Sequence, residues 1–284
     1  MREEAIKKYS FNSFSSPGVE VKSLDFLWEK ASLTGEIHRT EFYHLIWIEE
    51  GELSLMVDFE ELCLRSNDAF LIAPGQVCRF HLQSHPKAFS ILFLPEFLGE
   101  ATTDAPLLHH ILAIGPLERK VISLEHLPIN HLVRQLMHEL ECNAKDEYQL
   151  VVVRSCLRIL LAEVVRRLPK ETSSSNELAK RFFSEVEKHY HQWYNVNDYL
   201  PLLATQEKVL SQSVRLAIGI TPKAYIDHRR ILEAKRLLAY SSLSVKEIAF
   251  SLGVEEATNF NKFFRKHAGM SPNEFRLMQI RETK

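Results

Sequence analysis

The hydrophobic and polar positions of the first third of the chain alternate with the period of β-strands. Apolar and polar residues alternate from Glu52 to Asp58, directly after a Glu50–Gly51 turn. Ser66–Asp68 and Pro74–Gly75 interrupt the segments that follow, as turn residues do. Several short strands at this spacing, between about Val19 and Leu94, predict a small β-sandwich or barrel, and the interior of a barrel can hold one ligand.

The period becomes helical from about Ser123 to Leu168. Two apolar stripes at helical spacing predict two helices in this segment. The stripes are Leu132, Leu136 and Leu140, and then Leu157, Leu160, Leu161 and Val164. A polar, Ser-rich stretch from Pro169 to Asn176 follows, which is typical of a linker between domains. We expect the chain to be helical after it.

These patterns predict an α+β multidomain protein with four parts. We expect a strand-rich domain over residues 1–122, a helical extension over 123–169, a linker over 170–176 and an all-α domain over 177–284. The order of the parts places strands and helices in separate domains, as in α+β architectures.

Helix start and stop signals are explicit in the last domain. Thr221–Pro222 places a capping hydroxyl before a proline at the first helical position. Ser244–Glu247 and Ser271–Glu274 each combine a capping hydroxyl with a glutamate three residues later. Gly253 marks the end of the helix that begins after Ser244, and a second helix is expected to begin near Ala257. A short helix, a glycine turn and a second helix have the proportions of a helix-turn-helix.

The second of these helices separates aromatic from polar side chains. At about 100° per residue, Phe260, Phe263, Phe264 and His267 gather on one side. The opposite face and its flanks carry Thr258, Asn259, Asn261, Lys262, Arg265 and Lys266. Asn can pair with adenine, Arg and Lys with guanine, and the Thr methyl with thymine, while Lys266 could equally contact phosphates. Because an ordinary surface helix also has a polar face, this pattern alone leaves both interpretations open.

The composition is that of a globular chain. The 284 residues are 45% hydrophobic and 25% charged, which excludes a disordered chain and a membrane protein. The most hydrophobic stretch, Leu150–Val165, contains Arg154, Arg158 and Glu163 and does not form an apolar run of the ~18 residues that a membrane span needs. No secretory signal follows Met1, so we expect a cytoplasmic protein.

The charge is distributed unevenly. From Glu177 to the end there are 17 Lys and Arg against 12 Asp and Glu, whereas the remainder has 18 against 25. The basic C-terminal part is therefore the one expected to bind a polyanion. The cysteines have no CxxC spacing and no nearby histidine, so we expect them to be reduced, buried and inert. They are Cys63, Cys78, Cys142 and Cys156.

At its capped helices and glycine turns the chain resembles the AraC-type family of bacterial transcription regulators. The segments that carry the resemblance are Val245–Ala249, Gly253–Val254, Asn259–Lys266 and Gly269–Arg276. Gly219–Ile226 repeats the Gly-x-Ser/Thr-Pro ending about fifty residues earlier, as an internal duplication would. The resemblance covers about Glu177 to Arg276. It implies two helix-turn-helix units joined by a long helix, about Pro222 to Tyr240, so that one chain reaches two successive major-groove segments.

The first unit departs from the family pattern. Leu200 stands where the family usually has a small alanine, Pro201 follows it and Ala204 lies near the turn, which predicts altered packing. Its recognition helix, expected from Gln206 to Ile218, is less cationic than the second, so we expect weaker or largely phosphate-directed contacts. Its candidate DNA-binding residues are Lys208, Ser211, Gln212 and Arg215. In the second unit only Val254 replaces the usual aromatic residue.

The long helix between the two units is expected to pack through its apolar side. The residues expected to face the two units are Ile231, Ala234, Leu237 and Leu238. The charged side chains between them are expected to be solvated.

The N-terminal part is similar to the cupin-like sensor domain of these regulators, through Gly35–Arg39, Phe42–Gly51 and Pro74–Val77. The candidate ligand-binding residues are His38, His44, Trp47 and His81. The histidines and Glu49 raise the question of a metal site, but Thr40 stands where a His-x-His pair would need its second histidine. We therefore expect no metal and no cofactor, and instead a binding cavity or an interaction surface.

Three functions remain open. The favoured one is a sequence-specific, DNA-binding transcription regulator, not an enzyme, that senses a small molecule and forms a homodimer through its helical extension. Leu132, Leu136, Leu157 and Leu161 either form that interface or pack the domain's own core.

The second is a metal-dependent cupin enzyme, which would lose activity without His38 or His44. The third is a regulator without a ligand, whose N-terminal domain only dimerises or binds another protein. Activation of transcription would also need a contact with RNA polymerase, for which the sequence identifies no residue.

Overall fold

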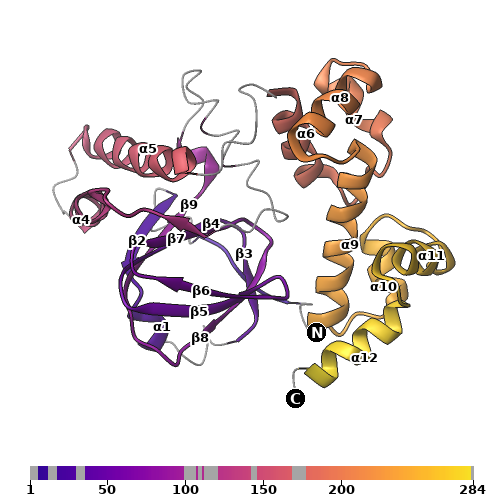
Figure 1. Ribbon diagram of the computed structural model, residues 1–284, viewed down its shortest axis with the longest axis horizontal. Coiled ribbons are helices and arrows are strands. Elements are labelled where there is room, and N and C mark those ends of the chain that lie inside the picture. The colour runs from indigo at the N-terminus through magenta and orange to yellow at the C-terminus, as the bar shows by residue number, and fades with distance from the viewer. Residues whose placement is uncertain are drawn as a thin grey trace. The chain divides into compact units, whose positions relative to one another are not determined.

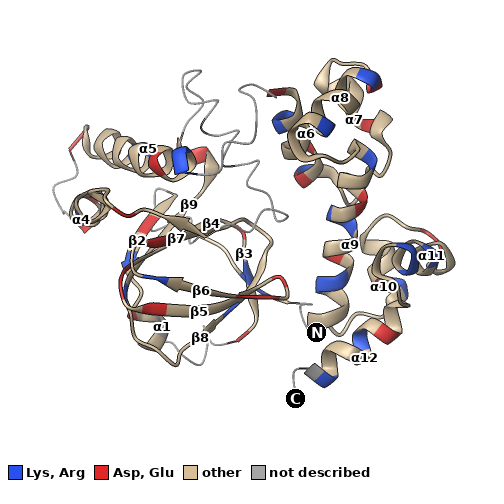
Figure 2. Cartoon of the chain, in the orientation of Figure 1, with Lys and Arg blue, Asp and Glu red and all other residues tan. Residues whose placement is uncertain are grey.

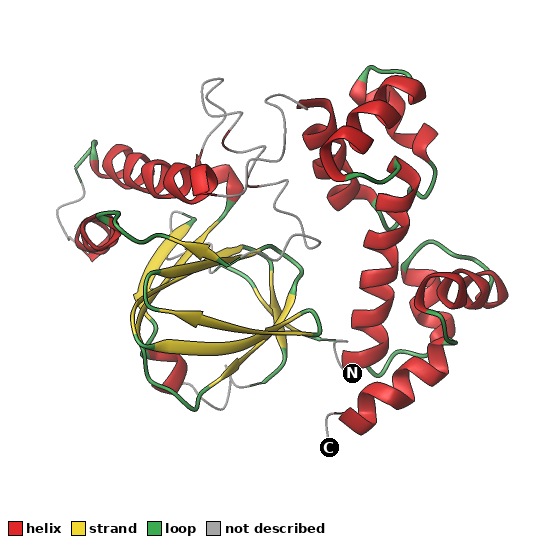
Figure 3. Cartoon of the chain, viewed as in Figure 1, coloured by secondary structure: helices red, strands yellow, loops and turns green. Residues whose placement is uncertain are grey.

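The protein consists of a strand-rich N-terminal unit and a helical C-terminal unit, which divide between residues 170 and 171 (Figures 1 and 3). The computed structural model describes residues 6–11, 18–29, 36–98, 107, 111, 121–141, 146–167 and 177–282. The predicted linker, 170–176, and Cys142 lie outside the described residues. None of the helices in these ranges is long and apolar enough to cross a membrane.

The N-terminal unit is built on two five-stranded sheets. In spatial order the first contains β1 (Lys7–Tyr9), β3 (His38–Thr40), β8 (Val77–His81), β5 (Glu52–Val57) and β6 (Glu60–Arg65). The second contains β10 (Ile122–Ser123), β7 (Asp68–Ile72), β4 (Tyr43–Glu50), β9 (Lys87–Phe93) and β2 (Val19–Ser23). The strand-rich fold is confirmed. The expectation of a barrel is corrected, because the strands of the described ranges form two separate hydrogen-bonded sheets rather than one closed sheet.

The two sheets share an apolar core, and the strands differ in how many of their faces are buried. In β5 the predicted alternation holds over the first four residues, since Leu53 and Leu55 are buried while Glu52 and Ser54 are exposed, and it ends at Met56, which is buried as well. In β4 both faces are buried. Ile46 and Ile48 belong to the core between the sheets, whereas Leu45 and Trp47 belong to a second core. A strand covered on both sides gives a continuous apolar run and no alternation.

Two helices cover the sheet that contains β4 (Figure 1). They are α4 (Ile129–Glu141) and α5 (Gln149–Arg167), as the helical period predicted. Leu136, Leu157 and Leu161 are fully buried in the core beneath them, and Leu132 is partly buried against it. Of the two roles considered for these leucines, the structure therefore supports packing of the unit's own core. The shorter elements are α1 (Phe26–Glu29) and the 3₁₀ helix η1 (Pro95–Leu98).

The C-terminal unit contains seven described helices, and the predicted caps begin three of them. They are α6 (Glu177–His189), α7 (Val196–Leu203), α8 (Glu207–Ile218), α9 (Pro222–Tyr240), α10 (Val245–Ser251), α11 (Ala257–Ala268) and α12 (Pro272–Glu282). The Thr221 hydroxyl accepts a hydrogen bond from the Ala224 N–H at 3.1 Å. The Ser244 and Ser271 hydroxyls accept likewise from the N–H of Glu247 and Glu274. Helix α7 continues through Pro201 to Leu203, with Leu200 half-buried.

Candidate nucleic-acid interface

The turn between α10 and α11 requires a glycine. Gly253 has a φ of +70°, which L-amino acids with a side chain rarely adopt. A Cβ atom built on it would lie 2.5 Å from the backbone oxygen of His191, which follows α6. Because His191 belongs to the first helix-turn-helix unit, the backbone of that unit contacts the α10–α11 turn of the second unit. This contact leaves no room for a side chain at Gly253.

Helix α11 is anchored by the aromatic side that the sequence predicted. Phe260 and Phe264 are fully buried. The Phe264 ring meets the Phe275 ring of α12 edge to face, with 5.6 Å between centroids. Aromatic pairs in this geometry stabilise packing beyond the area they bury, so the buried side holds the helix in one rotation about its axis.

The opposite side of α11 carries the six candidate DNA-binding residues, and all six are exposed. They are Thr258, Asn259, Asn261, Lys262, Arg265 and Lys266. The Asn259 amide donates to the Glu256 carboxylate at 3.2 Å, and the Asn261 amide donates to the Ala257 carbonyl at 2.8 Å. Figure 2 shows the basic residues of α11 in blue.

Helix α8 presents its candidate residues in the same way. Leu210 and Val214 are fully buried and hold the helix. Lys208, Gln212 and Arg215 are exposed and Ser211 is half-exposed. The exposed side of α8 also contains two apolar residues that the sequence analysis did not single out, Val209 and Leu216.

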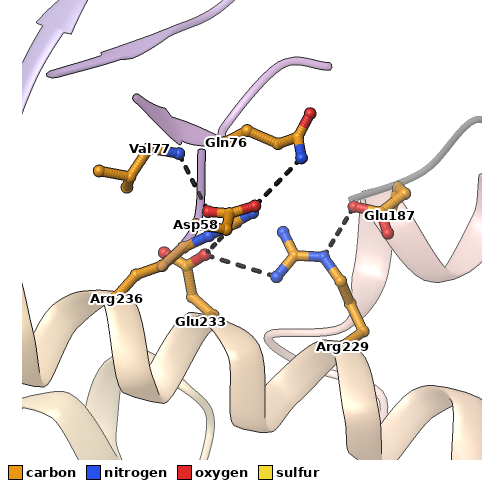
Figure 4. Close-up of polar contacts among 7 residues, drawn as sticks. All are labelled: Asp58, Gln76, Val77, Glu187, Arg229, Glu233 and Arg236. Atoms are coloured by element: carbon orange, nitrogen blue, oxygen red, sulfur yellow. Dashed lines mark hydrogen bonds and ion pairs between the residues drawn. The ribbon is translucent and has the colours of Figure 1, made fainter. Parts of the chain in front are cut away.

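The long helix α9 contacts α6 of the first helix-turn-helix unit through buried charged residues (Figure 4). Arg229 donates to Glu187 of α6 at 2.8 Å and to Glu233 at 3.4 Å, and its guanidinium lies 3.7 Å from the centroid of the Tyr190 ring. Arg236 donates to Glu233 at 3.0 Å. The surrounding carboxylates raise the pKa of Arg229 against the effect of burial, so it remains charged.

The neighbouring Arg230 connects α9 to the second unit. It donates to the Leu252 carbonyl, which lies at the end of α10. Its guanidinium also lies over the rings of Tyr194 and Phe263, 5.2 and 5.4 Å from their centroids. The apolar residues predicted to face the two units, from Ile231 to Leu238, are buried as expected.

The expectation that the charged residues between Ile231 and Leu238 are solvated is wrong for Glu233 and Arg236, and two arginines just before this range are buried as well. Arg229, Arg230, Glu233 and Arg236 are all buried. A buried ion is tolerated where counter-charges and hydrogen bonds replace its hydration. The carboxylates of Glu187 and Glu233 do so for Arg229. Arg230 has a hydrogen bond to one carbonyl and two ring contacts, and its buried Nε has no hydrogen-bond partner among the described residues.

In the N-terminal unit, two of the four candidate ligand-binding residues lie together inside the core between the sheets. The rings of His38 and His44 each have their centroid 5.9 Å from that of Phe80. His44 is hydrogen-bonded to the Ser90 hydroxyl, and His38 lies 3.4 Å from the Cys78 sulfur. Burial lowers the pKa of His38, and it lowers the pKa of His44 to about 3. Both rings are therefore uncharged near neutral pH.

The other two candidates lie elsewhere in the N-terminal unit. Trp47 stacks on Phe89 in the core beneath α4 and α5, with 5.7 Å between ring centroids. His81 is hydrogen-bonded to Glu61 at 2.7 Å on the outer side of its sheet. Across the described ranges, no three His, Cys, Asp or Glu side chains come together in a way that could hold a metal ion.

Two of the three cysteines that the structure describes are buried. Cys78 and Cys156 are buried, as expected, and burial raises the pKa of both thiols. Cys63 is exposed on β6, so the expectation of burial is wrong there.

Two family models match the two units. Residues 202–278 match a model described as a helix-turn-helix domain, and residues 31–153 match one described as an AraC-like ligand binding domain. Together with the two sheets and the paired helix-turn-helix units, these matches define a two-domain transcription regulator. The chain belongs to the AraC family of such regulators.

Relatives of the chain are described as transcription regulators. The transcriptional activator RhaS of Klebsiella pneumoniae is 22% identical over 251 residues, which cover 84% of this chain and 86% of that protein. The uncharacterized regulator YisR of Bacillus subtilis is 30% identical over 129 residues, 44% of this chain and 45% of YisR, so the match spans less than half of that relative. These descriptions give no support to the metal-dependent enzyme considered from the sequence.

The chain is also similar to solved structures. The match with ToxT from Vibrio cholerae covers 92% of this chain and 97% of the ToxT chain, at 14% identity and a TM-score of 0.42. The match with the DNA-binding domain of AdpA, which was solved in complex with a target DNA, covers 36% of this chain and 90% of the AdpA chain, at 26% identity and a TM-score of 0.33.

Proposed function

We propose that this regulator binds duplex DNA sequence-specifically through the exposed faces of α8 and α11. The observation that supports this most directly is the face of α11, where six exposed polar side chains lie opposite two fully buried phenylalanines. Asn261 offers the donor and acceptor pair that recognises adenine, and Lys262 and Arg265 offer donors for guanine. Lys266, nearer the end of the helix, is assigned to phosphate.

Replacing Lys262 or Arg265 by alanine tests this assignment. If either side chain recognises a base edge, specific binding should weaken by about 1–3 kcal/mol, while nonspecific binding changes less. The measurement is a titration of the full chain with a duplex obtained by in vitro selection and with an unrelated duplex. Lys188→Ala is the matched control, because Lys188 is an exposed lysine of α6 outside the proposed faces.

Two results would contradict the assignment. An equal loss on all duplexes, with a shallower salt dependence, would assign the side chain to phosphate. Unchanged binding in both variants would refute the proposed face of α11.

We further propose that the chain forms a homodimer through the outer side of α5. Val151 and Ile159 lie eight residues apart on one side of this helix and are 55% and 51% exposed, with Tyr148 exposed one turn earlier. We propose this exposed side of α5 as the dimer interface in place of the leucines considered from the sequence, because those leucines pack the core of the unit itself. The double variant Val151→Asp, Ile159→Asp should sediment as a monomer where the wild type sediments as a dimer. A monomeric wild type would refute the proposal.

The N-terminal unit is proposed to bind a small-molecule effector that changes the DNA-binding equilibrium. Support comes from the two uncharged histidines around Phe80, which place polar rings within an apolar interior. A thermal-shift screen of the full chain against sugars, aromatic acids and lipids should yield a compound that raises the unfolding temperature, since a ligand stabilises the state that binds it. The rise in unfolding temperature should be smaller in the His44→Phe variant. If no compound raised the unfolding temperature, the regulator without a ligand would be favoured.

A further inference from the structure

The two recognition helices present corresponding positions to the outside. Gly219 ends α8 with a φ of +74°, and Gly269 ends α11 with a φ of +76°. The buried residues of α8, Leu210 and Val214, stand fifty residues before those of α11, Phe260 and Phe264. Because the same positions point inward, each exposed residue of α8 corresponds to the residue of α11 fifty positions later.

At this register the outer faces differ along one edge. Val209 stands where α11 has Asn259, and Leu216 stands where α11 has Lys266. Val209 is 51% exposed and Leu216 is 65% exposed. The first helix thus replaces an amide and an ammonium group by two aliphatic side chains.

The position of Val209 determines which part of a duplex it would meet. It is the third residue of α8, and the first residues of a recognition helix contact base edges in the major groove. An aliphatic side chain forms no hydrogen bond there, and the apolar group that base pairs present in the major groove is the C5 methyl of thymine. Gln212 is exposed three residues later on the same face, and glutamine pairs with the N6 and N7 atoms of adenine.

We propose that α8 recognises A·T base pairs, with Val209 against a thymine methyl and Gln212 on an adenine. This inference rests on the proposed function, in which the face of α8 contacts DNA. It differs from the expectation of largely phosphate-directed contacts, because the exposed edge of α8 is apolar. Leu216, at the far end of the helix, is where the first unit lacks the phosphate contact assigned to Lys266.

The test removes one methyl group from the DNA. A duplex obtained by in vitro selection with the full chain is resynthesised with deoxyuridine at one thymidine at a time, which deletes the C5 methyl and keeps the O4 acceptor. The full chain should bind about fourfold more weakly at one or two positions of the segment assigned to the first unit, the loss expected for one buried methyl-sized group.

Variants of Val209 connect that loss to one side chain. Val209→Ala should bind the thymidine and deoxyuridine duplexes equally. Val209→Thr keeps a methyl group in place and should retain the difference. Deoxyuridine in the segment assigned to α11 should have the same effect on all three proteins. Because Val209 is exposed, the variants should keep the wild-type circular dichroism spectrum.

The outcomes separate this inference from the proposed function. If the wild type shows no preference for any duplex, the proposed function itself fails. If the wild type binds specifically but tolerates deoxyuridine at every position of the first segment, the A·T inference is overturned while the function stands. If Val209→Ala instead changes self-association and leaves the deoxyuridine effect intact, the aliphatic edge is a protein contact and the inference is again overturned.

Discussion

The first and second helix-turn-helix units share one register but differ at their turns. In the second unit the turn residue is Gly253, which has a φ of +70° and contacts the His191 backbone. In the first unit the chain turns through Ala204 with a φ of +47°, and Ala204 is exposed. The same left-handed backbone is therefore needed in both units, but only the second also needs an absent side chain.

The difference follows from what lies beside each turn. The segment after α6 belongs to the first unit, and its His191 backbone lies against the turn of the second. The Tyr194 ring of the same segment contacts Arg230, which donates to the Leu252 carbonyl beside that turn. Arg229 and Arg230, neighbours on α9, extend to the first and second units respectively. The second turn is thus part of the contact between the units, whereas the first turn is an ordinary surface turn.

Gly253→Ala should have the largest effect. The alanine would be strained at this φ by about 1–2 kcal/mol, and its Cβ would displace the His191 backbone at a further cost of about 1–3 kcal/mol. We expect the free energy of unfolding to fall by about 3 kcal/mol, measured by urea denaturation. Gly269→Ala is the matched control, since its φ is +76° and its Cβ would have no heavy atom within 4 Å. If both variants lost the same free energy of unfolding, the contact between Gly253 and His191 would not be the cause of the loss.

Arg229→Ala should have almost as large an effect, a loss of about 3 kcal/mol, because removing one partner of a buried ion pair leaves the other without its counter-charge. The Arg229 side chain is 3% exposed. The control is Lys188→Ala, which breaks an exposed pair with Glu185 and should cost about 0.5 kcal/mol or less. Should both variants unfold at the same urea concentration, α9 would not depend on this pair to hold the first unit.

The parts of this comparison that the sequence predicted are those with local signals. Capping residues, helical period and the glycine turn indicated α9 to α12 and the outer face of α11. The burial of Arg229 was missed because its partner, Glu187, lies 42 residues away and no local pattern connects them. In the N-terminal unit, the two-sided burial of β4 separates Trp47 from the histidines with which it was grouped.

Val209 and Leu216 were missed for a different reason. Only polar side chains of the first recognition helix were considered as candidates. The fifty-residue register, already visible in Gly219 and Gly269, could have identified both residues as members of the same outer face. The two recognition helices therefore differ in sequence at two positions, 209 and 216, which the duplication pairs with positions 259 and 266.

Leu216→Lys should make the first unit resemble the second. An added phosphate contact should raise affinity for all duplexes alike and steepen the slope of log affinity against log salt by about 0.9. The reciprocal variant, Lys266→Leu, should make that slope shallower by a similar amount. Binding titrations between low and moderate salt measure both. Slopes that do not change would show that this edge of the two helices does not face the DNA backbone.

Ala204→Gly should have the smallest effect and the opposite sign. Relief of the left-handed strain, worth about 1–2 kcal/mol, is partly offset by the greater freedom of glycine in the unfolded chain, about 0.5–1 kcal/mol. The balance is a gain of about 0.5 kcal/mol, visible as a higher urea midpoint. Since Ala204 is exposed, its methyl group contributes little packing that the variant could lose. A lower urea midpoint would mean that the Ala204 methyl group makes a stabilising contact. The first turn, like the second, would then depend on a contact with its surroundings, and the two units would differ less than proposed.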